Sequence, residues 1–239
     1  MKIKYILLIF IIFTTCCFAG EGYRVLFNPD RCDVNTAENS QTLFILDYSN
    51  SMNEMLIDST KHSMLLSSMK AILTKMSPAN KVGVRVYGHR WGFTPYDACK
   101  ASTLVVPIAE NNFGQISSSL AKLSPRGMTP ITYSLKQAVK NDFKEDTSDK
   151  HIILITDGGE NCDESPCTYA MELVKYRKDI RIDVIALNID NEEDLDQLRC
   201  TAKVTKGELY NANTHAELLR SLNSAFNSKK HVDAKIITK

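Results

Sequence analysis

The sequence predicts an α/β fold, in which a doubly wound, mostly parallel six-stranded sheet carries helices on both faces. Strand-like and helix-like segments alternate from residue 42 to residue 228, and such alternation is typical of parallel strands joined by crossover helices. Several strands are short and fully apolar, as expected of a sheet that is covered on both faces. One pair of consecutive strands is joined by a loop alone, which indicates a single antiparallel edge strand.

The first half of the chain alternates three strands with three helices. The strands are predicted at residues 42–46, 82–87 and 103–108. Helices are predicted where apolar residues recur three or four positions apart and so share one helix face. These residues are Leu65, Met69, Ile72 and Met76, then Phe113, Ile116, Leu120 and Leu123, and after Pro130 the residues Ile131, Leu135, Ala138 and Val139. Only a loop separates the second and third strands, so the third is expected to be the antiparallel edge.

The second half repeats this alternation. Its strands are predicted at residues 151–156, 182–187 and 208–211. Helices are predicted after Ser165-Pro166, from Asn191, and near the end of the chain. Their inner faces carry Tyr169, Leu173 and Val174, then Leu195, Leu198 and Ala202, and finally Leu218, Leu222 and Phe226. No internal repeat or low-complexity linker interrupts the pattern, so one domain is expected over residues 42–228.

The two ends of the chain are expected to lie outside this domain. Residues 1–19 have the layout of a secretory signal peptide, because two lysines precede an uncharged apolar run and small residues follow it. The run is shorter than the roughly 20 residues that a membrane span needs, although an uncleaved or lipid-linked anchor stays open. A pre-strand segment is assigned to residues 20–41 and a short basic tail to 229–239. We therefore expect an extracytoplasmic protein, periplasmic or secreted.

Composition and charge exclude some classes of partner. The 239 residues are 44% hydrophobic and 24% charged, and the formal net charge is +1. These are ordinary values for a soluble globular protein. No basic excess points to nucleic acid or to a membrane surface. We expect neither a nucleic-acid partner nor a stable membrane span after signal cleavage, and the sequence indicates no oligomeric state.

The cysteines indicate disulfide bonding if the protein is exported. Five remain beyond the predicted signal peptide: Cys32, Cys99, Cys162, Cys167 and Cys200. Cysteines in an oxidising compartment tend to pair, and an odd number leaves at least one without an internal partner. Cys162 and Cys167 are close enough in sequence to close a local loop, and a disulfide between them is favoured over a zinc site, since no further ligands stand at zinc-like spacing. The sequence gives no pairing for the other three.

Two aspartates follow predicted buried strands. Asp47 ends the strand at residues 42–46, and Asp157 ends the strand at 151–156. In a doubly wound sheet the functional crevice lies beyond the carboxyl ends of the strands, and these two strands are expected to be neighbours. Two carboxylates brought together in a partly buried site repel one another unless a cation compensates. A divalent cation is therefore expected between them.

Three hydroxyl groups near these aspartates suit the same cation. Ser49 and Ser51 share the turn that follows Asp47, and Thr129 lies in a loop before a predicted helix. Carboxylate and hydroxyl oxygens without histidine or thiol are hard ligands. This set favours Mg²⁺, with Mn²⁺ or Ca²⁺ as alternatives, over zinc or copper.

The pattern Asp47-x-Ser49-x-Ser51, then Thr129, then Asp157 followed by Gly158, resembles the metal-ion-dependent adhesion site of the von Willebrand factor A domain. The family writes this site as DxSxS with a distant Thr and a distant Asp, and its fold is Rossmann-like. The resemblance spans roughly residues 40–228. Three further stretches resemble an exported bacterial subgroup. They are residues 84–90 (VRVYGHR), 156–162 (TDGGENC) and 198–200 (LRC).

The resemblance implies an adhesion-type protein-binding module rather than an enzyme. Ser49 and Ser51 would be direct metal ligands, and Thr129 would bind directly or through water. Asp47 and Asp157 would act partly through water and hold the hydroxyls. The remaining position on the metal would take an acidic side chain from a partner protein. Because no carboxylate of the chain binds directly in this arrangement, the metal stays electrophilic.

Residues on neighbouring loops are candidates for partner contact. The loop at residues 88–99 carries Arg90, Trp91, Phe93 and Tyr96, and Arg126 precedes Thr129. Aromatic residues and arginine are enriched at interface hot spots. The alternative, that the aromatic residues fold back over the sheet edge, stays open. Three acidic residues follow Asp157 and indicate either a solvated rim, which is favoured, or a second cation site. They are Glu160, Asp163 and Glu164.

Two other functions stay open at this point. A metal-assisted hydrolase or phosphatase is conceivable, since Asp47 ends the first strand. However, the second acid that aspartate-nucleophile phosphatases generally need two residues later is replaced by Ser49. No GxSxG, HExxH or P-loop motif appears. The other alternative is a structural subunit whose metal only ties loops together.

Overall fold

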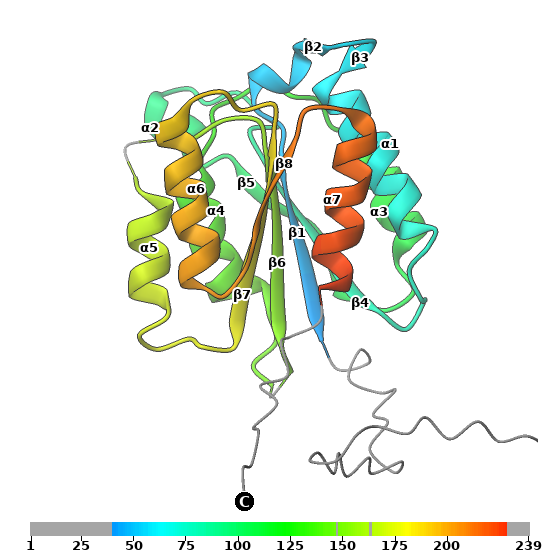
Figure 1. Cartoon of the computed structure of the whole chain (residues 1–239), viewed down its shortest axis with the longest axis vertical. Coiled ribbons are helices and arrows are strands. Elements are labelled where there is room, and N and C mark those ends of the chain that lie inside the picture. The colour runs from blue at the N-terminus through cyan, green and yellow to red at the C-terminus, as the bar shows by residue number, and fades with distance from the viewer. Residues whose placement is uncertain (1–39, 147, 163, 229–239) are drawn as a thin grey trace, which may run out of the picture. The chain divides into compact units, whose positions relative to one another are not determined.

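The computed structural model of the protein describes residues 40–228, apart from residues 147 and 163. In this part of the chain a central six-stranded sheet is covered by helices on both faces (Figure 1). The predicted signal peptide, the basic tail, Cys32 and all but the last two residues of the pre-strand segment lie outside the described residues. Among the helices of the described part, none is both long enough and apolar enough to cross a membrane.

The sheet has the strand order β5-β4-β1-β6-β7-β8. Its strands are β1 (Gln41–Asp47), β4 (Lys81–Tyr87), β5 (Ser102–Ala109), β6 (Lys150–Thr156), β7 (Ile180–Leu187) and β8 (Leu209–Ala212). Neighbouring strands are parallel except β5, which pairs antiparallel with β4 at one edge. The predicted fold class, including its single antiparallel edge strand, is confirmed.

Helices form one layer on each face of the sheet (Figure 1). One layer contains α1 (Lys61–Leu73), α3 (Phe113–Leu120) and α7 (His215–Asn227). The other contains α4 (Ile131–Gln137), α5 (Pro166–Leu173) and α6 (Glu192–Val204). A single π-helical turn, Ala138–Asp142, continues α4. Each layer packs on the sheet through its own apolar core.

The central strand β1 explains why both faces are covered. Phe44 and Leu46 pack into the core beneath α1, whereas Leu43 and Ile45 pack into the core beneath α4, and all four are fully buried. Burying each such side chain stabilises the fold by about 1.5–3 kcal/mol. Strong burial on both faces fixes the register of β1, and it therefore fixes where Asp47 leaves the sheet.

Several short elements at the carboxyl edge of the sheet have no clear periodic signal in the sequence. They are the 3-10 turn η2 (Asn50–Asn53), the two-stranded hairpin of β2 (Met55–Leu56) and β3 (Ser59–Thr60), and helix α2 (Pro95–Ala98). Local side chains hold some of them in place. The hydroxyl of Thr94, for example, accepts a hydrogen bond from the backbone N–H of Asp97 and caps α2.

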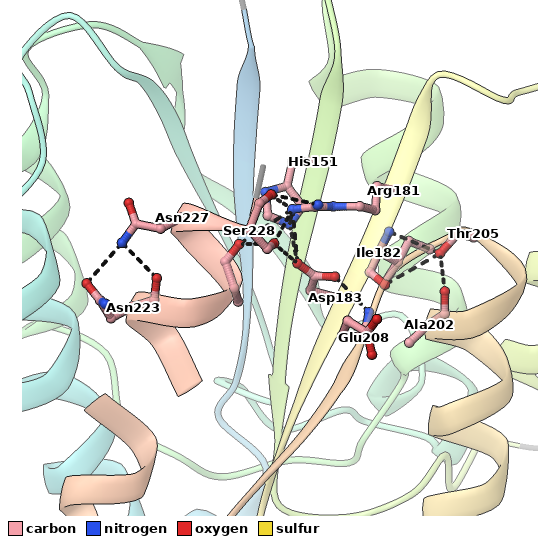
Figure 2. A network of polar contacts seen from close by, with 11 residues as sticks. His151, Arg181, Ile182, Asp183, Ala202, Thr205, Glu208, Asn223, Asn227 and Ser228 are labelled. Carbon is pink, nitrogen blue, oxygen red and sulfur yellow. Dashed lines mark hydrogen bonds and ion pairs between the residues drawn. The ribbon is translucent and has the colours of Figure 1, made fainter. Parts of the chain in front are cut away.

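A buried polar network lies at the amino ends of β6 and β7, opposite the carboxyl edge of the sheet (Figure 2). At its centre is Asp183, whose side chain is fully buried. The Asp183 carboxylate accepts hydrogen bonds from the backbone N–H of Glu208 at 2.8 Å and from the Ser228 hydroxyl at 3.2 Å. His151 Nε2 lies 2.9 Å from Asp183 Oδ2, and Arg181 Nη2 lies 3.1 Å from it.

The same network fastens the end of α7 to the sheet. Arg181 Nη1 donates to the backbone carbonyl of Ser228 at 2.8 Å, and its Nη2 donates to the Ser228 hydroxyl at 2.8 Å. Guanidinium groups at a helix C-terminus satisfy carbonyls that have no partner within the helix. Burial lowers the pKa of His151, so Arg181 is the main positive charge that faces Asp183 at neutral pH.

We expect Asp183→Ala to lower the free energy of unfolding by about 3–5 kcal/mol, because it leaves Arg181 and His151 without their buried partner. Urea denaturation followed by circular dichroism measures this change. Asp196→Ala is the control, since Asp196 pairs with Arg199 on the exposed face of α6 and should change the free energy by less than about 0.5 kcal/mol. Equal effects from both substitutions would contradict this account of the network.

Candidate metal centre

The candidate metal centre lies where β1 and β6 end side by side at the carboxyl edge of the sheet. Asp47 is the last residue of β1, and Asp157 directly follows β6. Because the two strands are parallel neighbours, their carboxyl ends meet at the same edge. The predicted adjacency of these strands is confirmed, and the charge of Asp157 acts on the carboxyl group of Asp47.

Asp47 is fully buried, and its side chain connects the turn after β1 to the end of β6. Its Oδ1 accepts a hydrogen bond from the backbone N–H of Ser49 at 2.7 Å, and its Oδ2 accepts one from the hydroxyl of Thr156 at 2.9 Å. Burial and the negative charge of Asp157 together raise the pKa of Asp47 to about 6. Two ionised carboxylates at this edge therefore cost free energy, which a cation between them would offset.

The two serines bridge the aspartates. The Ser49 and Ser51 hydroxyl oxygens lie 3.0 Å apart, and the Ser51 hydroxyl donates to Asp157 Oδ1 at 2.8 Å. Ser49 is almost completely buried, whereas Ser51 is partly exposed. Asp47, Ser49, Ser51 and Asp157 thus form one hydrogen-bonded cluster, although 106 positions separate Ser51 from Asp157 in sequence.

A glycine allows two further loops to reach this cluster. Gly88, directly after β4, has a left-handed φ of 68°. A Cβ at Gly88 would lie 2.6 Å from the backbone nitrogen of Ser49 and 2.7 Å from the carbonyl oxygen of Met128. No side chain fits in that space, so glycine is required where the three loops converge.

The loop that carries Thr129 lies against the serine turn. Gly127 pairs with Ser49 in an isolated β-bridge, and the backbone N–H of Asn50 donates to the Gly127 carbonyl at 3.0 Å. The backbone N–H of Thr129 donates to Asn161 Oδ1 at 2.7 Å, which ties this loop to the segment after Asp157. Thr129 itself is 5% exposed. The structure therefore places Thr129 on a loop that is anchored both to Ser49 and to the Asp157 segment.

Lys61 is a residue of this centre that the sequence reasoning missed. It is the first residue of α1 and is 5% exposed. Its Nζ lies 3.0 Å from Asp157 Oδ2 and 2.8 Å from Glu54 Oε2. A positive charge in the first turn of a helix opposes the helix dipole, and this unfavourable placement was the only local signal that Lys61 has a special environment.

Of the acidic residues after Asp157, Glu160 fits neither alternative that the sequence left open, because its side chain binds backbone groups. Glu160 Oε2 accepts the backbone N–H of Thr132 at 2.7 Å, and its Oε1 accepts the backbone N–H of Cys162 at 3.0 Å. Burial raises the pKa of Glu160 despite these bonds. Glu164 pairs with Lys136 on the surface, and Asp163 lies outside the described residues. Glu160 thus holds the start of α4 against the Asp157 segment.

The predicted Cys162–Cys167 disulfide is wrong. Cys162 bonds to Cys99, and Cys167 bonds to Cys200, with Cα–Cα distances of 5.6 and 5.3 Å. The physical reason lies in α5: Ser165 caps this helix, so Cys167 already stands in its first turn, from which it bonds across to α6. Cys162 remains in the loop that faces Cys99. The first disulfide therefore ties the aromatic loop after β4 to the segment that carries Asp157.

The candidate partner residues are exposed at the same edge. Trp91, Phe93 and Tyr96 are 70%, 102% and 71% exposed. The alternative in which they fold back over the sheet is therefore wrong. Arg126 is also exposed, and Arg90 is exposed with its Nη2 donating to the Lys100 carbonyl at 3.2 Å.

Apolar exposure in the described residues is concentrated at the carboxyl edge of the sheet. Met55 and Ile57 of the β2–β3 hairpin are 64% and 67% exposed. With the three aromatic residues after β4, they make up five of the seven large apolar side chains found exposed in the described part of the chain. Figure 1 shows the hairpin and α2 at the carboxyl edge of the sheet. Concentrated apolar exposure of this kind marks an interaction surface more often than chance.

The ligand chemistry of the cluster fits a small hard cation. Its donors are serine hydroxyls and aspartate carboxylates, which suit Mg²⁺, Mn²⁺ or Ca²⁺. In the described residues, no group of three or more His, Cys, Asp or Glu side chains is arranged to hold a metal. An ion at this edge would therefore need hydroxyl ligands as well as carboxylates, and Ser49 and Ser51 carry hydroxyl oxygens beside the two aspartates.

Comparison with known proteins gives a family match over most of the chain. The model of the von Willebrand factor type A domain matches residues 40–211. The uncharacterised protein YwmC of Bacillus subtilis (strain 168) is 25% identical over 196 residues, which cover 80% of this chain and 85% of YwmC.

Solved structures share the fold at lower identity. Proximal thread matrix protein 1 from the mussel byssus superposes with a TM-score of 0.61 at 19% identity, over 80% of this chain and 46% of that one. Another structure of that mussel protein has a zinc-occupied MIDAS motif. The pilus adhesin SpaC from Lactobacillus rhamnosus GG superposes with a TM-score of 0.60 at 14% identity, over 80% of this chain and 30% of SpaC. The chain thus spans less than half of either protein, and at these identities the likeness concerns the fold.

Peptide mapping without reductant should recover Cys99 linked to Cys162 and Cys167 linked to Cys200. A Cys99→Ala/Cys162→Ala variant should lose about 2–4 kcal/mol of unfolding free energy, because this disulfide closes a loop of 63 residues in the unfolded chain. Denaturant unfolding under non-reducing conditions measures the loss. Recovery of a Cys162–Cys167 peptide would contradict the pairing.

Proposed function

The chain belongs to the von Willebrand factor type A domain family, and from this premise we propose that it is a metal-dependent, adhesion-type protein-binding module. Domains of this family serve as protein-interaction modules. In the proposed function a divalent cation at the carboxyl edge of the sheet binds an acidic side chain of a partner protein. The observation that carries the proposal is the cluster in which Ser49 and Ser51 connect the buried carboxylates of Asp47 and Asp157.

Each residue of the cluster, and Thr129 on the adjacent loop, has a distinct part in the proposed centre. Ser49 and Ser51 would bind the ion through their hydroxyl oxygens, and Thr129 would bind directly or through water. Asp47 and Asp157 would hold those hydroxyls and balance the charge of the ion. Asp47 accepts the backbone N–H of Ser49, and Asp157 accepts the hydroxyl of Ser51. The bound cation supplies an electrophilic position for an oxygen ligand from outside.

We infer Mg²⁺ as the resident ion, with Mn²⁺ and Ca²⁺ as alternatives. Hydroxyl and carboxylate oxygens are the ligands that Mg²⁺ prefers, and Mg²⁺ usually keeps some of its water. The zinc-occupied MIDAS motif of the mussel protein supports a divalent cation in a site of this type. In this chain the described residues near the cluster offer oxygen donors, which favours the harder ions.

The partner surface in this proposal lies at the same edge of the sheet as the metal centre. It consists of Trp91, Phe93 and Tyr96 after β4, together with Met55 and Ile57 of the β2–β3 hairpin, all of them exposed. Arg90 and Arg126 add positive charge to this surface and would favour an acidic partner. Apolar contacts would supply affinity, while the bond between the ion and a carboxylate would fix the position of the partner.

We further propose that the protein works outside the cytoplasm and is not an enzyme. Two disulfides support an oxidising compartment. The mussel matrix protein and the pilus adhesin, whose names describe extracellular proteins, share its fold. Neither name describes an enzyme, and no feature of the described residues favours the hydrolase alternative over binding.

Ser49→Ala should abolish Mg²⁺ binding measured by isothermal titration calorimetry, because it removes a ligand hydroxyl while the backbone bond to Asp47 stays. Capture of a partner from cell-envelope extract in the presence of Mg²⁺ should be lost in parallel. Ser117→Ala, on the exposed face of α3, is the matched control and should behave as the wild type. Mg²⁺ binding by folded Ser49→Ala at wild-type affinity would refute the proposed centre.

Replacing Trp91 and Phe93 together by alanine should lower the affinity for the captured partner by at least about tenfold. Truncation of an aromatic hot-spot residue typically costs about 2 kcal/mol or more of binding free energy. Mg²⁺ affinity should stay unchanged, because neither side chain belongs to the cluster. Tyr176→Ala is the control: Tyr176 is 67% exposed but follows α5, before the start of β7. Equal partner affinity in the double variant and the wild type, measured by surface plasmon resonance, would remove these residues from the interface.

A further inference from the structure

A buried ammonium group lies beside the proposed metal centre. Lys61 is 5% exposed, and its Nζ donates to Asp157 Oδ2 at 3.0 Å. It also donates to Glu54 Oε2 at 2.8 Å, but the Glu54 side chain is 65% exposed, so water screens its charge. The Asp157 side chain is fully buried. Within the described residues, the positively charged side chain that contacts Asp157 is Lys61.

The environment of Lys61 keeps it charged. Burial by itself lowers the pKa of a lysine. Here the Lys61 Nζ lies 3.0 Å from Asp157 Oδ2 and 2.8 Å from Glu54 Oε2. Ion pairs with two carboxylates favour the charged form of a buried lysine.

Lys61 divides the two oxygens of Asp157 between different partners. Oδ2 faces the ammonium, and Oδ1 accepts the hydroxyl of Ser51. Only Oδ1 is therefore turned toward the hydroxyls that would hold an ion. With Oδ2 engaged, Asp157 is held away from bidentate binding to the ion, which would otherwise fill two of its positions.

The charges of the centre lead to a second consequence. Asp47 and Asp157 together would neutralise a divalent cation completely. The ammonium of Lys61 beside Asp157 adds a positive charge to the loaded centre, and its other partner, Glu54, is screened by water because the Glu54 side chain is 65% exposed. A centre with this added positive charge attracts an anionic ligand more strongly than a neutral centre does. The same positive charge repels the incoming metal ion, so it lowers metal affinity.

We propose that Lys61 is the counter-ion of Asp157, and that its charge lowers the affinity for the metal while it raises the affinity of the metal-loaded centre for an anionic partner group. This inference rests on the proposed function, and it assigns Lys61 as a positioning residue that acts through Asp157. Before metal binds, Lys61 holds the Asp157 segment in place. With a metal bound, the charge of Lys61 would keep the centre electrophilic, and its hydrogen bond would hold Asp157 Oδ2 away from the ion.

Calorimetric titration with Mg²⁺ alone tests the inference on Lys61→Met, Lys61→Gln and Lys61→Arg. Loss of the charge in the Met and Gln variants should tighten Mg²⁺ binding by about tenfold or more, and Lys61→Arg should stay within about threefold of the wild type. Gln keeps an amide donor and provides a second readout if the Met variant folds poorly. Lys150→Met is the control, since Lys150 is equally buried and ion-paired, but at the far edge of the sheet.

A second measurement distinguishes the proposed electrostatic role of Lys61 from a role in which Lys61 only holds Asp157 in place. With Mg²⁺ saturating, acetate is titrated and followed by NMR chemical shifts. Lys61→Met and Lys61→Gln should bind acetate about tenfold more weakly than the wild type. In EDTA their melting temperatures should fall, and Mg²⁺ should raise them by more than it raises that of the wild type.

The outcomes distinguish this inference from the function on which it rests. Unchanged or weaker Mg²⁺ binding in Lys61→Gln and Lys61→Met, with Mg²⁺ binding intact in the wild type, would overturn the inference and leave the proposed metal centre standing. Tighter Mg²⁺ binding without any loss of acetate affinity would overturn the selectivity part. A wild-type protein that binds no Mg²⁺ would overturn the proposed function and this inference together.

Discussion

The repulsion between two buried carboxylates is the constraint on which the carboxyl edge of the sheet depends. Asp47 and Asp157 leave neighbouring strands whose register is fixed by apolar cores on both faces. Neither can move away without disturbing that packing. The surrounding groups all lower the resulting cost: the backbone N–H of Ser49, the hydroxyls of Ser51 and Thr156, and the ammonium of Lys61. All four groups donate hydrogen bonds to the carboxylates, so they stabilise the negative charge at this edge in the absence of a cation.

Much of the fold follows from the sequence because its signals are local. Fully apolar runs such as residues 42–46 identify strands buried on both faces, and a loop connection identifies the antiparallel edge strand β5. The adjacency of β1 and β6 also follows from the topology of doubly wound sheets. The cluster of Asp47, Ser49, Ser51 and Asp157 could be anticipated for the same reason, since each residue stands at a strand end or in the turn that follows.

The remaining features depend on contacts between distant parts of the chain. A local loop between Cys162 and Cys167 looked favourable by spacing, but the start of α5 directs Cys167 toward Cys200, and Cys162 meets a residue 63 positions away. Lys61 and Asp157 meet across 96 positions, and His151 meets Asp183 only because β6 and β7 are paired. Periodicity and composition contain no information about such pairs, since a lysine or a histidine looks the same whether it is solvated or buried beside a carboxylate.

The end of α7 is attached to the sheet on the side opposite the proposed metal centre. Gln41 begins β1 at that edge, and Arg181 holds Ser228 there through the end of α7 (Figures 1 and 2). The described polypeptide thus enters and leaves on one side, while the serine turn and the exposed aromatic loop stand on the other. Both ends of the described segment therefore lie away from the serine turn, and the backbone at these two ends does not cover the side of the sheet that carries the proposed metal centre.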